Sequence, residues 1–287
     1  MKQKKLVIFF PSIEKGGVEK NFFIISNFLS KKIEKISIIT SDPKNIKNKR
    51  IKIIKSNFNL KNKSRFIKNC DCIYLLIKEI LKDKNIIILS FQANLFATII
   101  SHFFNINIIS RANASPSGWL KNPIKKFIYR SVMKLSTKVV VNSNEMMTEF
   151  KNKLNLNSYV IYNPLDKKNI IKKSKKKIKL NFFKDKNFLK ILNIGRFTEQ
   201  KDQITLLKAI LLLKNKFKFK LIILGQGYNK DKLQSFIKIN NLEKKDKILK
   251  YIKNPYPIIK KSDLFILSSR YEGLPNVLLE AITLNTP

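Results

Sequence analysis

The sequence is poor in the residues that build disulfide scaffolds and metal centres. Its 287 residues include 2 cysteines and 1 histidine. Cys70 and Cys72 stand too close together for an ordinary disulfide, and His102 is too far along the chain to complete a metal site with them. This cysteine usage fits a reducing compartment, so we expect a cytoplasmic protein.

Acidic residues are also scarce, because 19 Asp and Glu stand against 59 Lys and Arg, for a formal charge of +40. The lysines are spread along the whole chain and are not interleaved with aromatics as base-stacking platforms would be, which disfavours a nucleic-acid partner. The joint excess of Lys, Ile, Asn and Phe is also what A/T-rich codons would produce. Peripheral contact with anionic lipid at the inner face of the plasma membrane stays open.

Long hydrophobic segments that would target or span a membrane are lacking too. The apolar run of residues 6–10 is too short for the core of a signal peptide. Residues 85–110 are uncharged and long enough to span a bilayer, but Gln92, Asn94 and His102 interrupt them. We predict a strand, a helix and a second strand there instead.

Strand and helix patterns alternate along the chain, which is typical of parallel α/β domains. The helix predicted over residues 66–81 would bury Cys70, Ile73, Ile77 and Leu81. The helix predicted from Pro123 is basic and amphipathic, so it fits either a membrane surface or a half-buried place in the domain. The basic run after residue 166 predicts a linker. The predicted division is therefore a first domain over 1–166, a linker over 167–187 and a second domain over 188–287.

The most informative stretch is residues 269–281, Ser-Arg-Tyr-Glu-Gly-Leu-Pro-Asn-Val-Leu-Leu-Glu-Ala. A strand ends before it, and Pro275 suits the first position of a helix. The N–H groups of Asn276 and Val277 would then form an anion site at the helix start. Glu272 and Glu280 frame this site and suit sugar hydroxyls. The stretch fits a ligand that has both phosphate and hydroxyls, namely a nucleotide sugar. The alternative is that Glu272 and Glu280 are solvated surface charges with no ligand.

Three further loops follow predicted strands. Arg196 and Lys201 flank one of them and could clamp a diphosphate, or they are surface charges. The glycines at 16–17 would let a ligand approach the backbone, or they form a plain tight turn. The turn at 225–227 lacks the full dinucleotide fingerprint. Arg111 ends another strand, where it would meet an anionic ligand or stand exposed.

These strings resemble the motifs of family-4 glycosyltransferases with the GT-B fold. Residues 269–281 resemble the pattern S-x-x-E-G-x-P-x-x-x-x-E-A, and Gly195 to Lys201 resemble G-R-L-x-x-x-K. Gly16-Gly17 and Gly225-Gln226-Gly227 follow the family's order as well. The resemblance implies an α/β protein of two Rossmann-like domains whose parallel sheets face a cleft. It implies a retaining transferase that moves a sugar from a nucleotide diphosphate sugar, a UDP-sugar, to a bacterial glycan or lipid-linked acceptor.

The resemblance also implies roles for individual residues. It implies that Glu272, Arg196 and Lys201 are catalytic, and that the two cations stabilise the leaving diphosphate. It also implies that Arg111 and Asn113 lie on the acceptor side. No D-x-D motif is present, so we expect a metal-independent reaction without a cofactor. The donor-binding set is Gly16, Gly17, Gly195, Gly225, Gly227, Gly273, Leu274, Asn276, Val277 and Glu280.

Members of the resembled family continue with further strands and helices, so the chain resembles a truncated member with an incomplete second domain. Three rival interpretations follow. One is an inactive remnant that at most binds nucleotide. Another is a basic protein that binds membrane or nucleic acid. The third, a nicotinamide-dependent Rossmann enzyme, lacks its glycine fingerprint.

Overall fold

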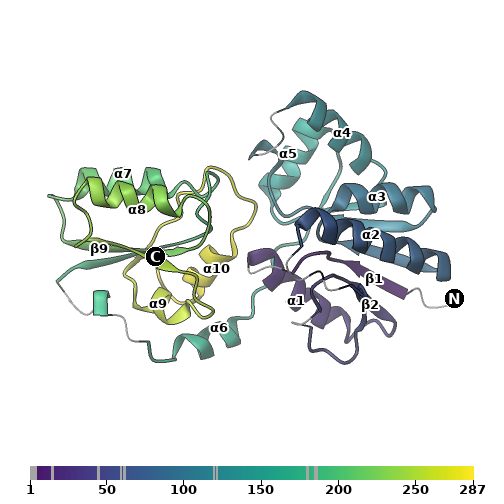
Figure 1. The fold of residues 1–287 in the computed structure, drawn as a ribbon, viewed down its shortest axis with the longest axis horizontal. Coiled ribbons are helices and arrows are strands. Elements are labelled where there is room, and N and C mark those ends of the chain that lie inside the picture. The colour runs from purple at the N-terminus through teal and green to yellow at the C-terminus, as the bar shows by residue number, and fades with distance from the viewer. Residues whose placement is uncertain are drawn as a thin grey trace. The chain divides into compact units, whose positions relative to one another are not determined.

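The computed structural model describes residues 5–13, 16–43, 46–58, 60, 63–118, 120, 122–178, 181–183 and 187–287. The chain forms two compact units, residues 1–164 and 165–287 (Figure 1). Each unit is built on a parallel β-sheet with helices packed against it. The α/β class predicted from the alternating pattern is therefore confirmed.

The first unit contains a seven-stranded parallel sheet in the order β3-β2-β1-β4-β5-β6-β7. Its strands are β1 Lys5–Phe9, β2 Ile36–Ile39, β3 Lys52–Ile54, β4 Ile86–Ser90, β5 Asn107–Arg111, β6 Lys138–Val141 and β7 Tyr159–Val160. Its helices are α1 Gly17–Leu29, α2 Arg65–Lys82, α3 Asn94–Phe103, α4 Pro123–Met133 and α5 Asn144–Leu154, with a 3₁₀ turn at Pro116–Gly118. Residues 85–110 thus form β4, α3 and β5, as predicted. No helix in the described ranges is long and apolar enough to cross a bilayer.

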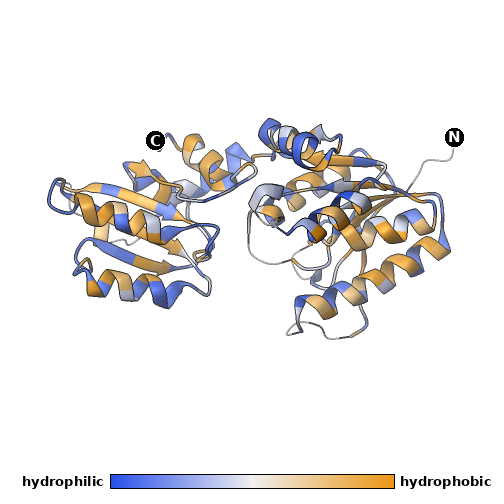
Figure 2. Cartoon of the chain, turned by 90° about the horizontal axis from the view of Figure 1, so that it is seen from above, coloured by the Kyte–Doolittle hydropathy of each residue, from blue (hydrophilic) through white to orange (hydrophobic). Residues whose placement is uncertain are grey.

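This sheet has a hydrophobic core on each face, because successive side chains of a strand point to opposite sides. Val7 and Phe9 join a core with α2 and α3, whereas Leu6 and Ile8 pack with Phe22 of α1. Figure 2 colours the strands as largely hydrophobic. The near-continuous apolar runs of the sequence are thus explained by helices on both faces.

The buried face of α2 differs from our prediction. Cys70 and Leu81 are exposed, Leu81 by 64%, whereas Cys72, Leu76 and Ile80 are fully buried. Both sets recur at helical spacing, so the sequence holds two overlapping apolar stripes. The stripe of Cys72, Leu76 and Ile80 packs most deeply against the β1 and β4 side chains. In the predicted stripe, Ile73 packs at the edge of the same core and Ile77 is half-buried, so only its two ends are exposed.

The second unit contains a four-stranded parallel sheet in the order β10-β9-β8-β11. Its strands are β8 Leu189–Ile194, β9 Phe219–Gly225, β10 Asp246–Lys250 and β11 Leu264–Phe265. Its helices are α6 Lys167–Ser174, α7 Gln203–Leu213, α8 Lys230–Ile239, α9 Tyr256–Lys261 and α10 Asn276–Thr283, with a 3₁₀ turn at Asn181–Phe183. Leu221 and Ile223 of β9 pack with α7 and α8, whereas Ile222 and Leu224 pack with α6, α9 and α10.

The linker prediction is wrong for the residues that form α6. Asp166 begins this helix, and its carboxylate accepts a hydrogen bond from the Asn169 N–H at 3.1 Å. Ile170 is only 3% exposed and packs with Ile258 and Ile259 of α9. A single buried isoleucine among lysines is too weak a periodic signal to find in sequence, and tertiary packing supplies the stability that the local pattern lacks. Residues 179, 180 and 184–186 of the predicted linker lie outside the described residues.

Asp246, the first residue of β10, is a buried carboxylate without a hydrogen-bond partner for either of its oxygens among the described residues. The residue is 3% exposed. Burial raises the pKa of its carboxyl from 3.8 to about 7, and the nearby Lys245 ammonium offsets only part of this shift. The folded protein therefore holds a proton that the unfolded chain releases between these two pH values.

We predict that the free energy of unfolding falls as pH rises from 4 to 8, because the folded state binds more protons than the unfolded chain in this window. At about 1.4 kcal/mol per pKa unit, the loss through Asp246 is on the order of 3–4 kcal/mol. Asp246→Asn should remove this loss, whereas Glu243→Gln, at an exposed position beside it, should not. Urea denaturation at several pH values measures both. An unchanged pH profile in Asp246→Asn would contradict the prediction.

Candidate functional site

The strand order of the second sheet brings two distant loops together. The chain moves outward from β8 to β9 and β10 and then returns to β11 on the other side of β8. Ligands of open parallel sheets bind at such a switch point, beyond the carboxyl ends of the strands. The loop of residues 195–202 follows β8, and the loop of residues 266–275 follows β11. The two strongest motifs of the sequence therefore meet at this edge.

An ion pair connects the two loops. The Lys201 ammonium donates to Oε1 of Glu272, 71 residues further along the chain. Both side chains are mostly buried, with 15% and 21% of their surfaces exposed. Ion pairs gain strength as solvent is excluded, so this pair sets the positions of both charged ends. The structure thus brings together two of the three residues that we predicted to be catalytic.

Further hydrogen bonds join the same loops. The Arg270 N–H donates to the Gln200 carbonyl at 2.9 Å, and Gln200 Nε2 donates to the Tyr271 carbonyl at 3.1 Å. Ser268 Oγ donates to the Lys201 carbonyl at 2.8 Å. Gln200, Ser268, Arg270 and Tyr271 had no predicted role. They lie in or next to the motif strings, which was a signal, but their partners depend on the strand order.

Asp202 anchors the start of α7 beside the ion pair. Its backbone is left-handed, with φ of 45°, which is uncommon for a residue other than glycine. Its carboxylate accepts hydrogen bonds from Arg270 Nε and Thr205 Oγ1, both at 2.9 Å. The bond from Arg270 is the main cause that lowers the pKa of Asp202. These contacts hold a strained backbone turn next to Lys201.

The glycines of this unit are explained by close packing of loops. A Cβ on Gly225 would lie 1.9 Å from the Gly195 carbonyl oxygen, and a Cβ on Gly227, whose φ is +156°, would lie 2.4 Å from the Phe197 carbonyl oxygen. The Phe197 N–H donates to the Gln226 carbonyl at 2.9 Å in the same contact. Gly225 and Gly227 therefore position the 195–202 loop, and the donor-binding role that we expected for them stays a prediction.

Arg196 differs from Lys201 in its surroundings. Its residue is exposed, and its guanidinium has no hydrogen bond or ion pair with the part of the chain that the structure describes. Only its carbonyl is bonded, by Gln203 Nε2 at 3.0 Å. Arg196 thus offers an unpaired cation in the same loop as Lys201.

Helix α10 begins one residue later than we predicted. Pro275 is its N-cap and not its first helical residue, and the Pro275 carbonyl accepts bonds from the N–H groups of Leu278 and Leu279. Gly273 and Leu274 lie half-buried just before it, and Asn276 and Val277 form its first turn. The strand-to-helix turn at the switch point is confirmed, while anion binding there stays a prediction.

Glu280 lies deeper than its predicted role suggests. It is 2% exposed, and its Oε1 accepts a hydrogen bond from the Tyr256 hydroxyl at 3.3 Å. Burial, and then the Glu280 carboxylate, raise the pKa of Tyr256 above its usual range. Tyr256, on α9, is a partner of Glu280 that the sequence motif did not indicate.

The remaining predicted residues belong to the first unit. Gly16 is the N-cap of α1, which begins at Gly17, and both are exposed. Arg111 is 3% exposed, so the surface alternative for it is wrong. Its Nη2 donates to the Ile161 carbonyl at 3.1 Å and to Asn163 Oδ1 at 3.0 Å, and burial lowers its pKa. These bonds give Arg111 a structural function at the carboxyl end of β5.

Asn113 is also tied to the backbone. Its Nδ2 donates to the Phe91 carbonyl at 3.1 Å, while its Oδ1 is buried with no partner among the described residues. Asn113 therefore connects the segments that follow β4 and β5. The acceptor role assigned to both Arg111 and Asn113 stays a prediction.

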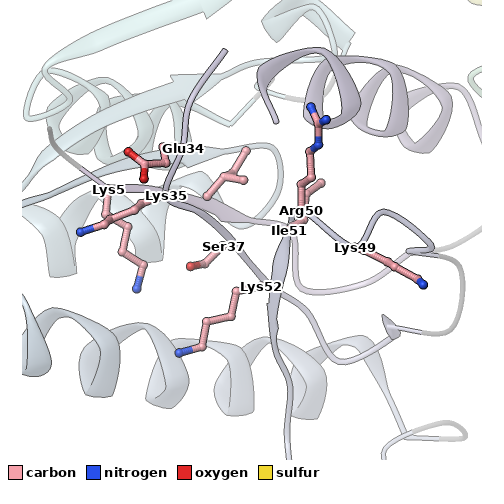
Figure 3. A pocket seen from close by; sticks show the side chains of 9 residues that line it. Lys5, Glu34, Lys35, Ser37, Lys49, Arg50, Ile51 and Lys52 are labelled. Carbon is pink, nitrogen blue, oxygen red and sulfur yellow. The ribbon is translucent and has the colours of Figure 1, made fainter. Parts of the chain in front are cut away.

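One pocket of about 400 Å³ lies in the first unit and is lined by none of the predicted site residues. It is at the amino ends of β1, β2 and β3, lined by Lys5 and by residues 34–37 and 49–52 (Figure 3). Parallel sheets bind ligands at their opposite, carboxyl edge. Lys5 is moreover paired with Glu79, so this pocket does not contribute to the candidate site.

The similarity to known protein sequences is concentrated in the second unit. Residues 172–287 match the family described as Glycosyl transferases group 1. An uncharacterised glycosyltransferase of Methanocaldococcus jannaschii is 45% identical over 108 residues, which make up 37% of this chain and 26% of that protein. The N-acetylgalactosamine-N,N'-diacetylbacillosaminyl-diphospho-undecaprenol 4-alpha-N-acetylgalactosaminyltransferase of Campylobacter jejuni is 39% identical over 123 residues, 43% of this chain and 32% of that protein. The matches thus span about a third or less of these curated relatives.

Solved structures extend the likeness to both units. Anabaena HepE in complex with UDP and glucose covers 99% of this chain and 79% of its own, with a TM-score of 0.75 and 16% identity. At this identity the likeness shows the fold alone. It confirms the GT-B fold that the motifs predicted.

We predict that Gly225→Ala destabilises the second unit by about 2–3 kcal/mol, because the new Cβ can fit only if the backbone of Gly195 moves. Gly195→Ala is the control, since its Cβ would meet the Lys201 and Gln203 side chains at 3.3–3.4 Å. Urea denaturation followed by circular dichroism compares the two. Equal unfolding free energies in the two variants would show that the contact between the loops is not tight.

Proposed function

We propose that this chain transfers a sugar from a nucleotide diphosphate sugar to an acceptor, because residues 172–287 match the family of glycosyl transferases group 1. The observation that carries the proposal is the Lys201–Glu272 pair, which joins the two motif loops at the switch point of the second sheet. A site that holds a cation and a carboxylate side by side suits a ligand with both phosphates and hydroxyls.

The chemistry follows from the charges. In the reaction the bond from the anomeric carbon to the diphosphate oxygen breaks, and a bond to the acceptor hydroxyl oxygen forms as that hydroxyl loses its proton. The departing diphosphate gains negative charge, which Arg196 and Lys201 would stabilise. Positive charge develops at the sugar ring, where Glu272 would stabilise it. We propose retention at the anomeric carbon and a reaction without a metal.

Donor binding requires Lys201 to exchange partners. In the described structure its ammonium is paired with Glu272, whereas the Arg196 guanidinium is exposed. A diphosphate that reaches Arg196 first could then compete with Glu272 for Lys201, which would release the Glu272 carboxylate toward the sugar. Glu280 would bind the ribose hydroxyls, in which case Tyr256 shares that carboxylate with the ligand.

The printed names of the relatives support finer proposals. The Campylobacter transferase is named for a diphospho-undecaprenol acceptor, and Anabaena HepE was crystallised with UDP and glucose. We propose a UDP-sugar as donor and a bacterial glycan or lipid-linked glycan as acceptor. We also propose a cytoplasmic location with peripheral contact to anionic membrane, and no nucleic-acid partner.

We predict that Lys201→Met and Arg196→Ala each raise the dissociation constant for UDP by about 10- to 100-fold, because each removes a charge-assisted hydrogen bond to phosphate. Calorimetric titration measures this, with GDP as a second ligand. Lys190→Met is the matched control: Lys190 is a similarly buried lysine that pairs with Asp263 at 3.8 Å, at the amino end of β8. A UDP affinity that falls equally in all three variants would contradict the site.

We predict that the chain transfers the sugar of a UDP-sugar to water, and so releases UDP, at equal rates with and without EDTA, because two side-chain cations take the place of a metal. Glu272→Gln should slow this release about 100-fold while UDP still binds, since its charge acts on the sugar ring. A panel of UDP-sugars with a coupled UDP assay tests both, and NMR of the product tests retention. UDP binding without any release would support a nucleotide-binding remnant instead.

A further inference from the structure

Helix α4 turns apolar side chains toward solvent. Ile124, Phe127 and Ile128 are 69%, 68% and 49% exposed, and only Tyr129 and Met133 of this helix are buried. A surface helix of a globular protein normally presents polar residues outward. The exposed isoleucines and phenylalanine of α4 therefore need an explanation outside the core of the unit.

Helix α3 exposes a second apolar stripe. Phe96, Ile99 and Phe103 are 51%, 48% and 81% exposed and recur at helical spacing. The two helices pack side by side (Figure 1), and Thr98 of α3 bonds to Ser136, just after α4, at 3.1 Å. We call these outward residues, Phe96, Ile99, Phe103, Ile124, Phe127 and Ile128, the α3–α4 face.

The charges beside this face have one sign. Lys125, Lys126 and Arg130 lie on α4, and Lys134 follows it. No aspartate or glutamate occurs between residues 84 and 144. The cations have no carboxylate within their own segment to neutralise them. Apolar side chains flanked by unneutralised cations match the boundary of an anionic bilayer, where acyl chains lie below phosphate groups.

We propose that the α3–α4 face binds the surface of an anionic lipid bilayer, with the phenylalanines and isoleucines among the acyl chains and the cations at the lipid phosphates. Two copies of this chain would bring like charges together at this face, which disfavours a dimer there. Nucleic acid would match the charge and could stack on the three phenylalanines, but it would leave the three isoleucines of the face uncovered, whereas acyl chains cover both kinds of side chain. The proposal rests on the peripheral membrane contact proposed above and adds the surface that makes it. Lipid binding is measured without any donor.

The test is flotation of the full chain with vesicles of phosphatidylcholine alone or mixed with phosphatidylglycerol, at low and high salt. We expect binding to the mixed vesicles that weakens with salt. Lys125→Gln with Lys126→Gln should lower the partition coefficient about 30-fold, because each cation near an anionic surface contributes to binding. Ile124→Ser with Phe127→Ser should lower it at least about tenfold, since the buried apolar area is lost.

The controls carry the same changes on the second unit. Lys208→Gln with Lys238→Gln, and Leu212→Ser with Ile239→Ser, alter exposed residues of α7 and α8, and both should bind vesicles like the unchanged chain. All variants should keep their affinity for UDP, so a failed transferase proposal and a failed membrane proposal give different results. Unchanged flotation of the α4 variants, or tighter binding to DNA than to mixed vesicles, would overturn the proposal. A concentration-dependent dimer lost in the Ile124 and Phe127 variant would overturn it as well.

Discussion

The contact between the loops that follow β8 and β11 is the constraint on which the second unit's site depends. The strands that carry these loops are neighbours only because the chain returns to β8 after building β9 and β10. Lys201 and Glu272 then close the switch point with opposite charges, and hydrogen bonds from Arg270, Gln200 and Ser268 fix the backbone around them. Without the ion pair, two partly buried charges would lose their partners, which costs more than an exposed pair contributes.

Glycine at two positions makes this arrangement possible. The turn after β9 touches the backbone of the 195–202 loop so closely that neither Gly225 nor Gly227 has room for a side chain. The loop is thereby held from both sides, by β9 on one and by the β11 loop on the other. A preformed site of this kind lowers the conformational cost of binding, because the loop does not have to be ordered by the ligand.

The acidic residues are unevenly distributed, so the cations have different surroundings in different parts of the chain. In the second unit the carboxylates Asp202, Asp263 and Glu272 each hold a cation and stabilise a particular loop or strand end. Between residues 84 and 144 no acid occurs, and there the cations flank exposed apolar side chains. A codon bias toward lysine explains the number of cations but not this separation. The chain therefore combines a site of paired charges with a basic face whose cations form no ion pair among the described residues.

The sequence alone determined the α/β class, most strand positions and the motif loops, because buried parallel strands are continuous apolar runs and the turns between them need particular residues. It also predicted the GT-B fold through its motifs. Local pattern could not choose between the two apolar stripes of α2, where Cys72 and not Cys70 is buried, or show that Ile170 turns a basic run into helix α6. Nor could it show that Arg111 and Glu280 are buried with polar partners. Those outcomes depend on which segments become neighbours in the sheets, so only the tertiary structure decided them.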